Sequence, residues 1–321
     1  MKNLRKKLGV FLVFIIIFLV GCGSKVEKES AAIEELPKME TKKNVDLNIV
    51  TTDKLLYSMV KTLVKEKHLV EYMFKDRESE INFTFSSDSL NNVAKKDLFI
   101  YMGAGFEPWI NDFIDKLNKS RVGVINVSRG VNLISYNKVV KYKDVVLKDN
   151  PYYLLNIDNY KVALLNIKNS IQDRDPKNRD QYEKNFSEQL KRLEGYQNEL
   201  KTIRDKLADY TFIVVEDELS YFVKYNDFKV MEINSQGNEK RILPQDSNAA
   251  LELESKLKES KKLILLYNND TVLKDNEALI GKYNIKTVNI KMINDESSYD
   301  AILKANIESL KKVYEEEPVI K

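Results

Sequence analysis

The sequence predicts an α/β protein of two lobes, with mainly parallel sheets in both lobes and one long rigid helix joining them. Three observations support this fold class. Strand-like apolar runs alternate with helical periodicity in residues 45–127, the same alternation returns in residues 211–314, and a long helical stripe lies between them. About 275 residues remain after the N-terminal leader and spacer, which is enough for two lobes with separate cores.

The linking helix is expected from Asn178 to Ala208, within a linking segment of residues 173–209. Asp175-Pro176 supplies a capping residue and a proline whose fixed φ suits a first helical turn. Apolar residues then recur every three or four positions, at Tyr182, Phe186, Leu190, Leu193, Tyr196, Leu200, Ile203 and Leu207. At 1.5 Å per residue the helix would be about 46 Å long. A coiled coil is the alternative, but α/β-like sequence on both sides favours a strut between lobes.

The first 21 residues are typical of a secretory signal peptide. They contain four basic residues, Lys2, Arg5, Lys6 and Lys7. Residues 8–20 are almost wholly apolar, yet too few to span a bilayer core of about 30 Å. The sequence Leu19-Val20-Gly21-Cys22 resembles a bacterial lipobox, which implies cleavage before Cys22 and acylation of that residue. We therefore expect Cys22, the only cysteine, to attach the protein to the membrane by lipid.

Residues 22–43 are polar, charged and poor in aromatic side chains, which predicts a disordered tether. Because the signal peptide carries four basic residues, its removal lowers the formal net charge from +3 to −1. The basic character of the whole chain therefore gives no reason to expect a nucleic-acid partner. The expected location is the extracytoplasmic face of a bacterial cell membrane.

The N-terminal lobe and crossover are assigned to residues 44–172. Strands are expected at residues 45–51, 69–74, 98–102 and 122–127, and helices at residues 53–67, 86–94, 108–117 and 157–171. Asp53 is expected to cap the first helix. Residues 75–85 are interpreted as a charged loop.

The C-terminal lobe is assigned to residues 210–321. Strands are expected at residues 211–216, 228–233, 262–267 and 287–290, and helices at residues 219–225, 249–258, 276–283 and 299–314. Ligands of parallel sheets bind beyond the carboxyl ends of the strands. Two such lobes on a lipid tether suggest an extracytoplasmic binding protein.

The segment Asp97-Leu-Phe-Ile-Tyr-Met-Gly-Ala-Gly-Phe-Glu-Pro-Trp109 closely resembles a stretch of the metal-binding solute receptors of ABC importers, the zinc and manganese receptors of the ZnuA/TroA type. Further segments fit that family in the same order: Val127 to Gly130, Asn150 to Asn156, Asp175 to Asn178, Tyr182 to Asn185, Ser220 to Phe222 and Tyr299 to Asn306. The resemblance implies a TroA-like fold with a ligand between the lobes and an ABC permease as partner. We expect a monomer.

The resemblance also implies that the metal site is altered or lost. The family places three histidines and one carboxylate in the cleft, and the matching positions here hold Ile81, Tyr152, Glu216 and Lys291. Zinc and manganese need imidazole or carboxylate donors. Isoleucine supplies none, and an ammonium repels a cation. We therefore expect no metal and no cofactor, and propose a Glu216–Lys291 ion pair if both side chains face the cleft.

Other candidates have plainer alternatives. His68, the only histidine, ends a lysine-rich helix and is expected to be solvent-exposed. The acidic run 216–218 either faces the cleft or sits at a helix N-terminus, where the macrodipole favours acidic residues. Tyr152 and Tyr153 either line a pocket for an organic ligand or pack in the core, and Trp109 is expected to be structural.

The sequence gives little support for an enzyme, and we expect no catalytic residue. One histidine and one lipid-bearing cysteine do not make a nucleophile–base pair. Gly103 and Gly105 lack the third glycine of a dinucleotide-binding motif. The expected function is a solute-binding lipoprotein of an ABC importer of the zinc and manganese family, with lost or altered metal specificity and an unidentified ligand. The alternative is a surface adhesin with the same fold and no transport role.

Overall fold

The computed structural model describes residues 46–117, 119–142, 145–231, 233, 240–244, 246–293 and 298–315. The predicted signal peptide, Cys22 and the tether lie outside these residues. Residues 45–321 form one compact unit. Within the described ranges, no helix is both long and apolar enough to cross a membrane.

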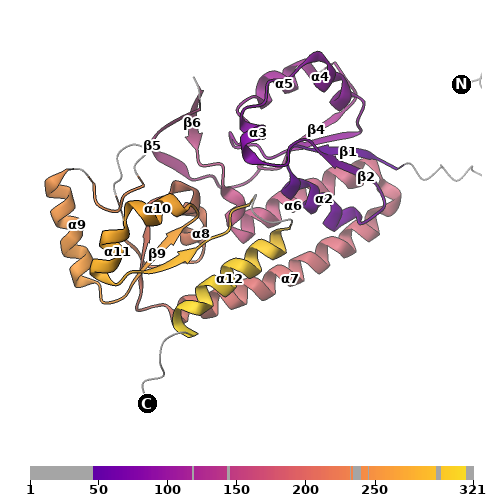
Figure 1. Ribbon diagram of the computed structural model, residues 1–321. Coiled ribbons are helices and arrows are strands. Elements are labelled where there is room, and N and C mark those ends of the chain that lie inside the picture. The colour runs from indigo at the N-terminus through magenta and orange to yellow at the C-terminus, as the bar shows by residue number, and fades with distance from the viewer. Residues whose placement is uncertain are drawn as a thin grey trace, which may run out of the picture. The chain divides into compact units, whose positions relative to one another are not determined.

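The N-terminal lobe contains a parallel sheet in the order β2-β1-β3-β4 (Figure 1). Its strands are β1 (Asn48–Thr51), β2 (Leu69–Tyr72), β3 (Leu98–Tyr101) and β4 (Gly123–Asn126), and its helices are α2 (Lys54–Val64), α3 (Arg77–Ile81), α4 (Ser87–Ala94) and α5 (Ile110–Leu117). All three strand pairings are parallel, as predicted. Helix α3 falls in the segment that the sequence analysis assigned to a loop.

Alternating strand residues separate the two faces of this sheet. Val50 and Phe99 pack with α4 and α5, whereas Ile49 and Leu98 pack with α2 and α6 (Ile157–Arg174). The predicted cap of α2 is present, because the Asp53 carboxylate accepts a hydrogen bond of 2.8 Å from the Leu56 N–H. This cap holds Asp53 at the carboxyl end of β1.

An antiparallel hairpin follows the first sheet. It consists of β5 (Ser135–Tyr142) and β6 (Val145–Asp149), and the 3-10 helix η1 (Tyr153–Leu155) comes directly after it. The sequence analysis gave this region no secondary structure. The hairpin leads the chain back to η1, and Tyr152 therefore lies where the hairpin meets helix α6.

The long helix is α7 (Arg179–Lys206), preceded by the 3-10 helix η2 (Pro176–Asn178). Its 28 residues give a length of about 42 Å, close to the prediction. It packs against α2, α6 and α12 (Tyr299–Glu315) of the same chain. The Asn185 amide donates a hydrogen bond of 2.6 Å to the Leu63 carbonyl. The Gln189 amide donates a hydrogen bond of 2.9 Å to the Asp300 carboxylate. The helix is therefore a strut within one chain.

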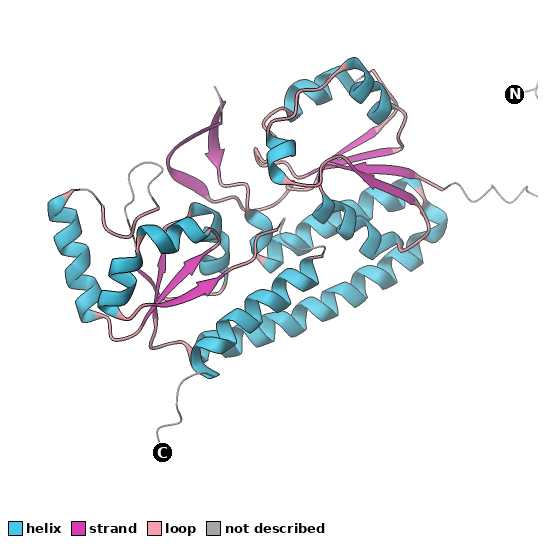
Figure 2. Cartoon of the chain, in the orientation of Figure 1, coloured by secondary structure: helices cyan, strands magenta, loops and turns pink. Residues whose placement is uncertain are grey.

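The C-terminal lobe repeats the architecture, with strands flanked by helices (Figure 2). Its parallel sheet has the order β10-β9-β7-β8. Its strands are β7 (Thr211–Val214), β8 (Val230–Met231), β9 (Leu263–Tyr267) and β10 (Lys286–Asn289), and its helices are η3 (Asp217–Leu219), α8 (Ser220–Tyr225), α9 (Ser247–Glu259), α10 (Asp270–Asp275) and α11 (Glu277–Tyr283). Helices α9, α10 and α11 cover one face, while α8 and α12 cover the other.

The expectation of separate cores was wrong. One cluster of buried side chains runs from Ile49 in the first sheet, along α7 through Leu193 and Ile203, to Ile264 in the second sheet. The apolar stripe of α7 serves both lobes, because α2 and α6 of the N-terminal lobe and α12 of the C-terminal lobe all pack on this helix.

Candidate functional site

The carboxyl edge of the first sheet ends in a tight turn that positions a buried glutamate. Gly103, Ala104 and Gly105 have φ values of +76°, +54° and +79°. A Cβ at Gly103 would lie 2.1 Å from the Asn126 Oδ1, so only glycine fits there. The turn directs Glu107 back beneath the sheet edge.

Glu107 is held by three hydrogen bonds. Its Oε1 accepts hydrogen bonds from the Thr52 hydroxyl, at 2.8 Å, and from the Met102 N–H, at 2.7 Å. Its Oε2 accepts a hydrogen bond of 3.0 Å from the Gly103 N–H. These donors come from the ends of β1 and β3. Glu107 therefore ties two neighbouring strands together at the edge where ligands of parallel sheets bind.

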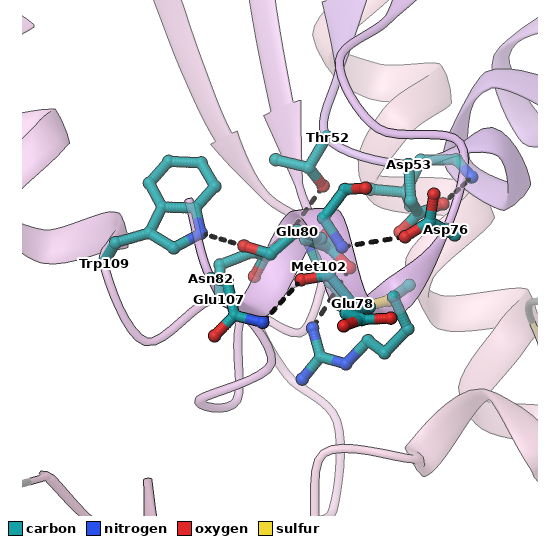
Figure 3. A network of polar contacts seen from close by, with 12 residues as sticks. Thr52, Asp53, Asp76, Glu78, Glu80, Asn82, Met102, Glu107 and Trp109 are labelled. Atoms are coloured by element: carbon teal, nitrogen blue, oxygen red, sulfur yellow. Dashed lines mark hydrogen bonds and ion pairs between the residues drawn. The ribbon is translucent and has the colours of Figure 1, made fainter. Parts of the chain in front are cut away.

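Two further carboxyl groups lie beside Glu107, as Figure 3 shows. Asp53, Glu80 and Glu107 are all at most 5% exposed. Burial raises the pKa of Glu80 to about 9, that of Glu107 to about 7 and that of Asp53 to about 6. Among the residues that the structure describes, Asp53 Oδ2 and Glu80 Oε1 have no hydrogen-bond partner, and both residues line a cavity of about 10 Å³. Burial therefore favours the protonated form of Glu80 at neutral pH.

Arg77 provides the cation next to this cluster. One guanidinium nitrogen, NH1, lies 3.0 Å from the Glu80 Oε2. The guanidinium carbon lies 3.7 Å from the centre of the Phe106 ring. The Trp109 Nε1–H donates 2.8 Å to the Glu80 carbonyl and fixes the end of α3.

The predicted positions in the N-terminal half of the site are therefore close to Arg77. Ile81 is the last residue of α3 and follows Glu80 directly. Tyr152 is half-buried, and its ring packs edge-on against Phe106 with centroids 5.9 Å apart. This placement favours aromatic packing beside Arg77 over an open organic pocket.

The predicted pair between Glu216 and Lys291 is replaced by a different one. Glu216 is buried after β7, and its Oε1 lies 3.1 Å from the Lys240 ammonium. Its Oε2 accepts 2.8 Å from the Asn268 N–H. Lys291 instead binds the Asn306 side chain through its backbone. The Lys291 N–H donates a hydrogen bond of 2.7 Å to the Asn306 Oδ1, and the Lys291 carbonyl accepts one of 3.2 Å from the Asn306 amide.

Asn276 explains why Lys240 is the partner. The Asn276 amide donates a hydrogen bond of 2.8 Å to the Lys240 carbonyl. The Asn276 Oδ1 accepts a hydrogen bond of 2.7 Å from the Ile242 N–H. These two bonds hold the segment before α9 beside the end of β7. The acidic run after Glu216 opens η3, as the alternative interpretation of residues 216–218 expected.

The prediction of an exposed His68 was wrong, because this side chain is completely buried. The Leu47 N–H donates a hydrogen bond of 3.2 Å to the His68 Nδ1. Because Nδ1 is an acceptor, the proton of the neutral ring is on Nε2, which lies 2.8 Å from the Tyr182 hydroxyl. Tyr182 donates 2.5 Å to Asp175. His68 therefore joins the start of β1 to the start of the strut and is remote from the Arg77 cluster in its contacts.

Two aromatic residues are structural. The Tyr153 hydroxyl donates 2.7 Å to the Met102 carbonyl from a fully buried position. Trp109 packs edge-on against Phe83 and Phe113, with ring centroids 4.8 and 5.4 Å away. Tyr153 therefore packs in the core rather than lining a pocket, and the prediction that Trp109 is structural is confirmed.

The acidic side chains of this arrangement already have protein partners. Within the described part of the chain, no group of three or more histidine, cysteine, aspartate or glutamate residues could hold a metal ion. Glu107 accepts three protein donors, while Glu80 and Glu216 already have cationic partners. Sequence analysis missed Arg77, Glu80 and Glu107 as site residues. The available signals were the position of Glu80 next to Ile81 and the inclusion of Glu107 in the family-like segment 97–109.

The sequence is similar to a family of known proteins. The model of a family described as "Zinc-uptake complex component A periplasmic" (ZnuA) matches residues 49–313. The high-affinity zinc uptake system protein ZnuA of Bacillus subtilis is 22% identical, over 96% of this chain and 97% of its own.

Solved structures have the same fold. The metal-dependent lipoprotein YcdH of Bacillus subtilis has a TM-score of 0.66 and 21% identity, covering 83% of this chain and 98% of its own. The laminin-binding protein Lbp of Streptococcus pyogenes has a TM-score of 0.61 and 21% identity, covering 83% and 98%.

Proposed function

Because this chain belongs to the ZnuA family of substrate-binding proteins of metal ABC transporters, we propose that it is a solute-binding lipoprotein with lost or altered metal specificity. The family serves transport rather than catalysis, and we propose no catalytic residue in this member. Cys22 would carry the lipid that keeps the protein at the extracytoplasmic face of the membrane. An ABC permease would be its partner, and it would act as a monomer.

One observation carries the proposal on specificity. The positions that match the family's four metal ligands hold Ile81, Tyr152, Glu216 and Lys291, and the chain's one histidine is buried against Tyr182. Glu216 is the only one of these four with a carboxylate, and Lys240 already pairs with it. A zinc or manganese ion would lack imidazole donors there and would meet protein cations.

Metal content tests this proposal. The protein is purified from cells supplied with zinc, manganese and iron, and the bound metals are measured by mass spectrometry. A substoichiometric content of all three metals is expected. One metal per chain, lost on Glu216→Gln, would contradict the proposal. His68→Gln is the matched control, because it removes the sole imidazole at a site outside the cleft.

A surface-binding role is the second candidate, favoured by the shared fold with a laminin-binding protein. Surface plasmon resonance with immobilised laminin distinguishes the two. Saturable binding of the mature chain, without any response to small solutes, would support adhesion. Absence of binding would leave transport as the favoured function.

A further inference from the structure

We propose that the Arg77 guanidinium is a resident cation that takes the place of a metal ion in this cleft and makes the site unreceptive to divalent metals. This inference rests on the proposed function, since it names the residue that changes the specificity of the same site. It concerns a side chain that lies outside the four matched ligand positions.

The contacts of Arg77 locate the cation. Two of the four matched positions lie beside this side chain. The Tyr152 ring packs edge-on against Phe106, over which the guanidinium lies, and Ile81 follows Glu80, whose Oε2 accepts a hydrogen bond of 3.0 Å from Arg77. The guanidinium lies over the Phe106 ring, which is completely buried. A planar, weakly hydrated guanidinium suits an aromatic face, whereas zinc and manganese require donor atoms on every side.

The charge of Arg77 is also needed where it lies. Glu80 is 1% exposed, whereas the Arg77 side chain is 22% exposed, so the cation bridges the buried cluster and the solvent. Its positive charge also favours the ionised form of Asp53. A second positive charge next to Arg77 would be repelled at short range.

The C-terminal half of the site follows the same principle. The Lys240 ammonium binds the buried Glu216, the residue at the third matched position. Protein cations therefore contact carboxylates in or next to matched positions in both lobes. The cleft supplies from its own side chains the positive charge that a bound metal would bring.

Chemical rescue tests the resident cation. Arg77→Ala should lower the melting temperature of the mature chain by roughly 5 °C, because it leaves the buried cluster without its cation. Guanidinium chloride at about 20 mM, far below denaturing concentrations, should restore at least half of that loss. Urea at the same concentration has nearly the same shape without charge and should restore nothing. Arg121→Ala, at an exposed arginine, is the control.

A second readout uses the single tryptophan of the chain. Trp109 binds the Glu80 carbonyl, and its fluorescence maximum should shift to the red in Arg77→Ala and return with guanidinium. If Arg77→Ala does not fold, Arg77→Lys serves instead, and it should keep most of the stability because it keeps the charge. Rescue by urea as well as by guanidinium, or equal loss in both variants, would overturn the proposal.

Exclusion of metal is measured separately. Zinc affinity should rise at least about tenfold in Arg77→Ala relative to the wild type, because a neighbouring positive charge is removed. An unchanged affinity in the folded variant would overturn the exclusion. A tight zinc site in the wild type would instead contradict the proposed function, and the guanidinium rescue would still report whether Arg77 is a resident cation.

Discussion

The buried carboxylate of Glu216 lies 3.1 Å from the ammonium of Lys240, which comes from a segment held by Asn276. A carboxylate with 3% of its side chain exposed would be strongly unfavourable alone. The Lys240 side chain is 37% exposed, so solvent screens part of the attraction. The pair therefore balances the charge of buried Glu216 with a protein group.

The first prediction concerns this pair. Lys240→Met should lower the free energy of unfolding by about 1 kcal/mol, since Glu216 keeps its bond to Asn268 and loses only the screened ion pair. Urea denaturation measures the change, and Lys274→Met at an exposed lysine is the control. In the Glu216→Gln background the same substitution should have less effect. Equal effects in both backgrounds would show that the pair is not coupled.

The second prediction concerns the only histidine. Burial lowers the pKa of His68, with Lys67 acting in the same direction and Asp175, Asp46 and Asp97 opposing it. The unfolded chain therefore takes up this proton first as pH falls, and the stability contribution is present above pH 6.5 and declines below it.

Urea denaturation of the wild type and His68→Gln between pH 8 and pH 5 tests this sign. The wild type should lose stability relative to the variant only below about pH 6.5. The single imidazole signal in NMR spectra should titrate below that value. Titration above it would contradict the buried neutral ring.

The third prediction concerns Glu80. Its pKa is raised from 4.5 to about 9. Between these two pH values the folded protein holds a proton that the unfolded chain has lost, so the free energy of unfolding falls as pH rises from 4.5 to about 9. Glu80→Gln mimics the protonated form. The wild type should lose up to about 4 kcal/mol relative to Glu80→Gln between pH 5 and pH 8.

Glu78→Gln on the same helix is the matched control, because Glu78 is exposed. It should leave the pH dependence of the wild type unchanged. Parallel stability curves for the wild type and Glu80→Gln would show that Glu80 is ionised in the folded protein at neutral pH.

The fourth prediction concerns the membrane anchor. Cys22→Ala should abolish incorporation of labelled palmitate and release the protein from the membrane fraction, since each buried methylene contributes about 0.8 kcal/mol to membrane affinity. Labelling and fractionation of the producing cells measure both effects. Continued lipid labelling of the variant would refute the assignment of Cys22.

Periodicity predicted most of the elements, because both sheets are built from short buried strands that alternate with amphipathic helices. The apolar stripe of residues 182–207 predicted α7 to within two residues at each end. Helix α3 escaped prediction because five residues with four polar side chains give no periodic signal. The shared core also escaped prediction, because periodicity does not reveal which elements the α7 stripe packs against.

Long-range contacts explain the errors in the site. His68 lies in a lysine-rich stretch that suggests exposure, yet its partner Tyr182 is 114 residues away. The partner of Glu216 depends on the two bonds from Asn276 to the segment containing Lys240. Neither pairing follows from local sequence. The loss of imidazole donors could be predicted, because it depends only on the chain containing one histidine.

Calorimetric titration of the mature, unacylated protein with zinc and with manganese tests the central claim most directly. The account predicts no stoichiometric binding of either metal with micromolar or tighter affinity. One equivalent of zinc or manganese bound at micromolar affinity, and lost in Glu216→Gln, would contradict it.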